Sequence, residues 1–123
     1  MVVQNQIRFL VLLISLSAPA PVAAQTLSPE DVEKFVAGSM RTCVPGTTER
    51  MISEGADADR ASLFATEYCR CTGASLAASM NRQDIELFEA EGRYPEAVIN
   101  RVPGISLACY QYAVELLGDP RLN

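Results

Sequence analysis

The fold is decided by residues 57–80, which read DADRASLFATEYCRCTGASLAASM. An acidic residue, Asp57 or Asp59, opens the stretch, and apolar residues then recur at helical spacing up to about Met80. The pattern predicts one long helix whose many alanines and serines keep it slim enough to pack closely against its neighbours. Gly73 weakens this helix by roughly 1 kcal/mol relative to alanine.

Two of the four cysteines, Cys69 and Cys71, lie inside this predicted helix. Residues two apart on a helix point about 200° away from each other, so these two side chains cannot form a bond without breaking the helix. Each is therefore expected to pair with Cys43 or Cys109. Two pairings remain: Cys43–Cys69 with Cys71–Cys109, or Cys43–Cys71 with Cys69–Cys109. We favour the first pairing, because Cys71 and Cys109 both lie on apolar helix faces.

The chain before this helix also begins with a helix signal. Residues 28–31 read SPED, in which a serine can cap, a proline suits the first turn and two acids favour the positive end of the helix dipole. Residues 44–46 (VPG) are expected to stop this helix, so that it ends shortly before Cys43. Residues 47–57 are ambiguous and allow a short turn capped by a threonine.

Downstream, Asn81 with Asp84 three residues later predicts a helix start, and Gly92 predicts the end of that helix. Pro95 opens another short helix, which we expect the Pro-Gly pair at 103–104 to break. No stretch shows the alternating, β-branched pattern of a strand.

The last predicted helix runs from about Ile105 to Leu117 and brings the fourth cysteine onto its inner face. That face is expected to carry Ile105, Cys109, Tyr112, Ala113 and Leu116. The sequence therefore predicts an all-α fold, a small disulfide-stapled bundle of four to five helices. Each disulfide closes a loop on the order of 25 to 40 residues and contributes about 3 to 4 kcal/mol by the chain-entropy model.

Residues 1–24 have the layout of a secretory signal peptide, with Arg8 as the only charge, a short apolar run and a tail of small residues. We expect cleavage between Ala24 and Gln25. An uncleaved membrane anchor needs about 20 apolar residues, and this run is too short. The prediction is a single helical domain, residues 25–123, that is periplasmic or secreted and has no stable membrane insertion after cleavage.

The composition excludes several kinds of activity. The chain has no histidine and no tryptophan, so it lacks the usual base near neutral pH and the commonest zinc ligand. Without residues 1–24 it has nine basic and 15 acidic residues, a net charge of −6, which argues against nucleic acid as a partner. No phosphate-binding loop, nucleophile motif or haem-attachment motif is present. We therefore expect no enzyme activity, no cofactor and no metal.

The cysteines allow two other interpretations. Cys69 and Cys71 could form a redox-active C-x-C pair, with Arg70 lowering a thiol pKa, but a thioredoxin-type motif is absent. Four thiols could also bind zinc, although structural zinc sites are rare in oxidising compartments. An even number of cysteines in a short exported chain is more typical of structural disulfides.

A partner surface is predicted on the acidic stretch 84–96, which holds five acids against one base, Arg93. Such a stretch could receive a basic partner, although charge runs more often only solvate a helix face. We expect Tyr112 to pack in the core, whereas Tyr110 lies on another face as an exposed anchor or as a partly buried side chain with its hydroxyl in water. The candidate surface residues are Asp84, Glu86, Glu89, Glu91, Tyr94 and Tyr110.

In architecture and cysteine use the chain is similar to small exported bacterial helical proteins such as acid-stress chaperones and immunity proteins, but no motif identifies a family. The leading hypothesis is a non-enzymatic exported protein that binds another periplasmic or secreted protein, in an inhibitor, immunity or accessory role. The alternatives are a thiol-redox or oxidation-sensing protein that uses Cys69 and Cys71, and a stress chaperone.

Overall fold

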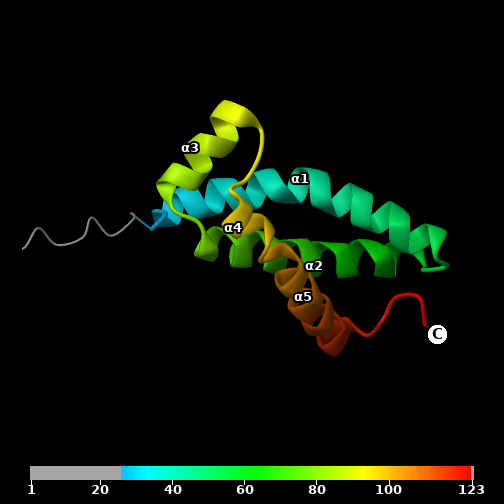
Figure 1. Cartoon of the computed structure of the whole chain (residues 1–123). Coiled ribbons are helices and arrows are strands. Elements are labelled where there is room, and N and C mark those ends of the chain that lie inside the picture. The colour runs from blue at the N-terminus through cyan, green and yellow to red at the C-terminus, as the bar shows by residue number, and fades with distance from the viewer. Residues whose placement is uncertain (1–25, 123) are drawn as a thin grey trace, which may run out of the picture.

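The computed structural model describes residues 26–122 (Figure 1). Its helices are α1 (Pro29–Ser53), α2 (Ala58–Ser79), α3 (Arg82–Glu91), α4 (Glu96–Ile99) and α5 (Val102–Leu117). Within this range the chain forms no strand, and one isolated bridge joins Thr26 to Asn81. The predicted all-α fold with two disulfides is confirmed. The predicted signal peptide, with its cleavage site after Ala24, lies outside the described residues.

The first helix is longer than the sequence predicts, because α1 continues through Pro45 to Ser53. The predicted stop at residues 44–46 is therefore wrong, and Cys43 lies inside the helix. A proline in a helix interior has no N–H to donate and costs about 3 kcal/mol or more.

Packing downstream of Pro45 offsets this cost. Met51 is only 1% exposed and belongs to the hydrophobic core, and full burial of such a side chain contributes about 1.5–3 kcal/mol. The Thr48 hydroxyl donates a hydrogen bond to the Val44 carbonyl at 2.7 Å, and the disulfide between Cys43 and Cys69 ties the same turn to α2. The helix continues because its far end is held by tertiary contacts.

The helices α1 and α2 form a long antiparallel hairpin, with the two lying side by side in Figure 1. The turn between them uses Gly55 at φ +100°, in the left-handed region that favours glycine, and the Ala56 N–H donates to the Met51 carbonyl at 3.0 Å. Asp57 caps α2 as predicted, since its carboxylate accepts hydrogen bonds from the backbone N–H groups of Asp59 and Arg60.

The core lies between the turn end of this hairpin and α5. Its buried cluster comprises Met51, Ala56, Ala61, Phe64 and Ala113, with Tyr68, Tyr110 and Val114 packed against it. Phe64 is the largest of the fully buried side chains, and the Tyr110 ring meets its ring edge-on at 5.4 Å between centroids. The core is small because alanines make up much of it.

The last helix begins at Val102, so the predicted break at residues 103–104 is wrong. A proline in the first turn of a helix is tolerated, because its missing N–H has no partner there in any case. Cys109 and Ala113 are buried as predicted. Tyr112 and Leu116 were expected on the same inner face, but they are 47% and 54% exposed.

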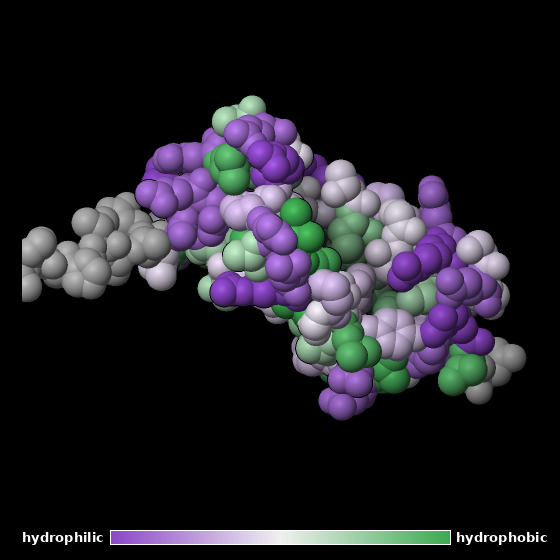
Figure 2. Space-filling view, in the orientation of Figure 1, coloured by the Kyte–Doolittle hydropathy of each residue, from purple (hydrophilic) through white to green (hydrophobic). Residues whose placement is uncertain are grey.

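This difference follows from how α5 packs. The helix lies mainly against α2, so only a narrow face is covered, and Tyr110 rather than Tyr112 turns toward Phe64. Apolar surface therefore remains visible over α5 in the space-filling view (Figure 2). Among the described residues, the exposed large apolar side chains of α5 are Val102, Leu107, Tyr112, Leu116 and Leu117.

The two disulfides are Cys43–Cys69 and Cys71–Cys109, the first of the two pairings that the sequence leaves open. One joins α1 to α2 and the other joins α2 to α5, so α2 is fastened on two sides. Cys69 and Cys109 are fully buried, whereas Cys43 and Cys71 are partly exposed.

A candidate binding groove beside α3

The helix α3 stands apart from the hairpin and contains no buried residue (Figure 1). Its start is well defined, because Asn81 and Asp84 form the predicted capping box, with hydrogen bonds of 3.0 and 2.9 Å in the two directions. Gly92 ends the helix in the left-handed conformation at φ +71°. The Thr26–Asn81 bridge ties the N-terminal end of α3 to the chain just before α1.

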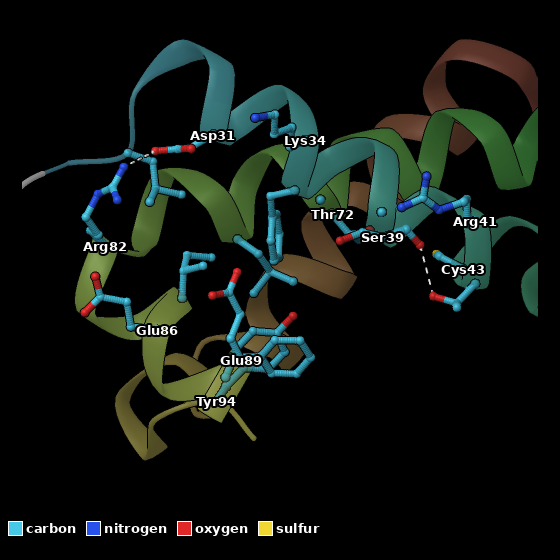
Figure 3. Close-up of a pocket in the computed structure, with 18 residues that line it drawn as sticks. Asp31, Lys34, Ser39, Arg41, Cys43, Thr72, Arg82, Glu86, Glu89 and Tyr94 are labelled. Carbon is cyan, nitrogen blue, oxygen red and sulfur yellow. Dashed lines mark hydrogen bonds and ion pairs between the residues drawn. The ribbon is translucent and has the colours of Figure 1, made fainter. Parts of the chain in front are cut away.

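Between α3 and the hairpin lies a groove of about 780 Å³, which we call the α3 groove (Figure 3). The first half of α1, the second half of α2, α3 and Tyr94 line it. Its apolar lining consists of Leu27, Phe35, Leu76, Ile85, Phe88 and Tyr94. A cleft of this volume with a mostly apolar lining has the character of a ligand site.

Three aromatic rings form one wall of the α3 groove. Phe88 and Tyr94 stack at 4.4 Å between centroids, and Phe35 from α1 meets Tyr94 edge-on at 6.4 Å. Burial raises the pKa of the Tyr94 phenol. Phe88 nevertheless remains 37% exposed. The rings are held in place but are not fully covered.

Charged side chains stand at the rim of the groove. Arg82 and Asp31 form an ion pair of 3.1 Å that joins α3 to α1 at one end, and Lys34 pairs with Glu30 at 2.8 Å. Figure 3 places Arg41 and Cys43 at the other end, with Glu86 and Glu89 on the α3 side. Among residues 26–122, Arg41, Glu86 and Glu89 form no ion pair.

The predicted surface residues do not all lie together. Glu86, Glu89 and Tyr94 line the α3 groove. Asp84 is used in the helix cap, and Glu91 pairs with Arg93 at 2.8 Å outside the groove.

Tyr110 lies far from this group, beside the C-terminal end of the described chain. Its hydroxyl donates to the Asp119 carboxylate at 2.9 Å and also contacts Arg121, whose guanidinium lies 5.7 Å from the ring centroid. Arg121 pairs with Asp119 and Glu54 at 2.8 Å each. The hydrogen bonds that the Arg121 side chain and backbone donate to Asp119 hold the pKa of that carboxyl well below its usual range. Tyr110 is therefore part of a polar tether between the C-terminal segment and the α1–α2 turn.

The sequence identified the acidic members of the groove but not its apolar lining. Phe35 and Phe88 read as ordinary core positions of two amphipathic helices, because their spacing is that of any buried helix face. The short length of the helix at 82–91 is the one indication in the sequence, because a short helix can bury its apolar side chains only against an element from elsewhere in the chain. The sequence does not say which element supplies that contact.

The cysteines leave no dithiol in the described chain, because all four are paired. Cys69 and Cys71 point to different partners, and Arg70 forms an ion pair with Glu67 at 2.8 Å. No group of three or more possible metal ligands occurs within residues 26–122.

A second, smaller hollow of about 270 Å³ lies between α2 and α5. Its lining residues are Glu67, Arg70, Cys71, Ala74, Ser75 and Tyr112. It has about a third of the volume of the α3 groove, and an ion pair between Glu67 and Arg70 lies at its rim, so the α3 groove is the better candidate for a binding site.

Comparison of the chain with models of protein families, with curated proteins and with solved structures gives no match. None of the helices in the described part of the chain is both long enough and apolar enough to cross a membrane.

Proposed function

We propose that this is an exported, periplasmic, non-enzymatic protein that binds another exported protein through the α3 groove. The bound element is an apolar helical segment of the partner. Export is supported by the secretory layout of residues 1–24, with cleavage between Ala24 and Gln25, and is compatible with two disulfides in a small helical protein.

The observation that carries the proposal is the apolar, aromatic groove beside a helix with no buried residue. The apolar side chains Ile85 and Phe88 of α3 face space that water fills in the free protein. A helical segment laid between α3 and the hairpin buries them, and each 100 Å² of apolar surface removed from water contributes about 2.5 kcal/mol. Helix-in-groove recognition of this kind is a common mode of peptide binding.

The chemistry of the groove supports binding rather than catalysis. The strongly shifted pKa values belong to Asp119 and Arg121, which lie in the C-terminal tether and not in the groove. Perturbed acids and bases usually gather where a reaction takes place.

Co-purification with a groove variant tests this proposal. The tagged protein is exported at native expression, recovered under oxidising conditions, and its partners are quantified by mass spectrometry. Phe88→Ala removes a partly exposed wall of the groove, so we expect it to lose a stoichiometric partner that the wild type retains. Leu107→Ala is the matched control, because Leu107 is exposed on α5 and lies outside the groove.

Identification of the partner must be followed by reconstitution from purified components at a 1:1 ratio. Two results contradict the proposal: no stoichiometric partner with the wild type, or a partner that Phe88→Ala retains as well as Leu107→Ala does.

A further inference from the structure

We infer that the segment bound in the α3 groove is a cationic amphipathic helix, with apolar side chains against the aromatic wall and Lys or Arg side chains beside Glu86 and Glu89. This inference rests on the proposed function and specifies the chemistry of the partner.

The helix α3 presents both apolar and acidic side chains to the groove. Ile85 and Phe88 are three residues apart, as are Glu86 and Glu89, and residues at this spacing share one face of a helix. All four line the groove. On the side of α3 that lines the groove, Ile85 and Phe88 form an apolar row, and Glu86 and Glu89 form an acidic row. The two rows are about 100° apart around the helix axis. A ligand helix that contacts both rows needs an apolar face with basic residues along its flank.

Some of the charged side chains that line the groove are already paired. Asp31 and Arg82 neutralise each other across one end of the groove, at 3.1 Å. Lys34 is paired with Glu30 at 2.8 Å. The lining charges without an ion pair in the described chain are then two acids, Glu86 and Glu89, and one base, Arg41. The lining as a whole is balanced, with three acids and three bases, but Lys34 and Arg41 lie on α1, whereas α3 carries Glu86 and Glu89 and its Arg82 is paired with Asp31. The negative charge on the α3 side favours basic residues on the flank of the ligand that faces α3.

Arg41 lines the groove and forms no ion pair within residues 26–122. Figure 3 shows it at the end of the groove away from the Arg82–Asp31 pair. The carbonyl end of a bound helix carries partial negative charge, so this position suits the C-terminus of the segment. Glu86 and Glu89 thus complement the basic side chains of a cationic helix, and Arg41 complements its negative C-terminal end.

The net charge of the protein also favours a basic partner. The chain from residue 25 onward has a net charge of −6, so its field attracts a basic segment from a distance. Such attraction weakens as salt rises, with a screening length of about 8 Å at physiological ionic strength.

The test uses a synthetic peptide and the exported protein with both disulfides formed. The peptide has about 14 residues, enough for a helix of about 21 Å, with leucines at i, i+3, i+4 and i+7 and lysines on the flank. Matched peptides carry glutamine or glutamate in place of every lysine. Binding is measured by isothermal titration calorimetry at low and at physiological salt.

We expect the lysine peptide to bind, and to bind more weakly at the higher salt. The double reversal Glu86→Lys with Glu89→Lys should weaken binding of this peptide about tenfold and should create binding of the glutamate peptide. The matched control is Glu49→Lys with Glu115→Lys, which makes the same change in net charge on exposed glutamates outside the groove. It should leave the preference for the lysine peptide in place.

Equal affinity for the lysine and glutamine peptides overturns the inference, as does the same loss of binding in the control pair. A concentration-dependent dimer that excludes the peptide from the groove also overturns it, because the occupant is then a second copy of this chain.

The proposed function is tested separately by the Phe88→Ala co-purification. A partner retained by the wild type and lost by that variant, without the reciprocal charge effect, leaves the function standing and removes only the inference. If the charge reversal exchanges the peptide preference but the extract yields no partner, the charge preference of the groove stands and the proposed function is contradicted.

Discussion

Replacement of Pro45 by alanine should stabilise the protein, because Pro45 lies in the interior of a continuous helix. Alanine restores the N–H that donates to the Arg41 carbonyl four residues earlier and removes the clash of the ring. These two effects are worth about 3 kcal/mol together. The substitution also increases the conformational entropy of the unfolded chain, which lowers the free energy of unfolding by about 0.4–1 kcal/mol. The net expectation is a gain of about 2 kcal/mol.

The assay is urea unfolding followed by circular dichroism, with both disulfides intact. With an m value of about 1 kcal/mol/M for a domain of this size, the midpoint should rise by about 2 M. Pro29→Ala is the matched control, because Pro29 occupies the first turn of α1, where an N–H has no helical partner. That variant should move the midpoint by much less.

A lower or unchanged midpoint for Pro45→Ala refutes the reasoning. If α1 ended near Val44, as the sequence predicts, Pro45 would lie in a connecting turn, where its rigidity favours the folded state. The sign of the effect therefore distinguishes one long helix from two shorter ones. An increased m value without a change of midpoint would instead indicate a change in the unfolded state.

Three further substitutions probe the core, the second disulfide and the C-terminal tether. Phe64→Ala should destabilise the protein by about 3–5 kcal/mol, measured by urea unfolding, since Phe64 is 1% exposed at the centre of the core; a loss under about 1 kcal/mol contradicts this placement. Replacing Cys71 and Cys109 together by alanine removes a bridge between residues 38 apart and should cost about 4 kcal/mol by the chain-entropy model, with the helices still visible by circular dichroism at low temperature. Asp119→Asn concerns pH, because the folded pKa of Asp119 is lowered mainly by its hydrogen bonds with Arg121. Its contribution is fully present above about pH 4 and is lost as pH falls toward the folded pKa, so stability should fall less steeply between about pH 4 and pH 2 in the variant than in the wild type. Identical slopes would show that the tether does not affect stability.

Local signals in the sequence predicted the parts of the fold that depend on neighbouring residues. The capping box of Asn81 and Asp84 forms as expected, because both partners lie within one turn of the chain. The opposed directions of Cys69 and Cys71 follow from helix geometry alone, and the structure pairs each with a different helix.

The errors occur where a distant contact decides the outcome. Pro45 is a strong local stop signal, but the burial of Met51 and the disulfide to α2 stabilise α1 beyond it. Tyr112 was expected in the core but is 47% exposed, because the rotation of α5 is set by the position of α2 and not by its own apolar pattern. An almost uncharged helix such as α5 gives little indication of which face is covered.

The candidate groove could not be predicted as a unit for the same reason. Its acidic members, Glu86 and Glu89, are conspicuous in the sequence as part of a charge run. Its aromatic members come from α1, α3 and the segment after α3, and only their meeting in space makes them a wall. The sequence therefore indicated the polar half of the candidate site and left out the apolar half.

The Cys43–Cys69 disulfide has a consequence for when binding can begin. Cys43 forms part of one end of the α3 groove and is also half of the bond that fastens α1 to α2. A newly made chain in a reducing compartment has the same residues but lacks the bond that fixes that end. Under the proposed function, oxidation after export completes the groove, and the proposed partner is then not bound in the cytoplasm.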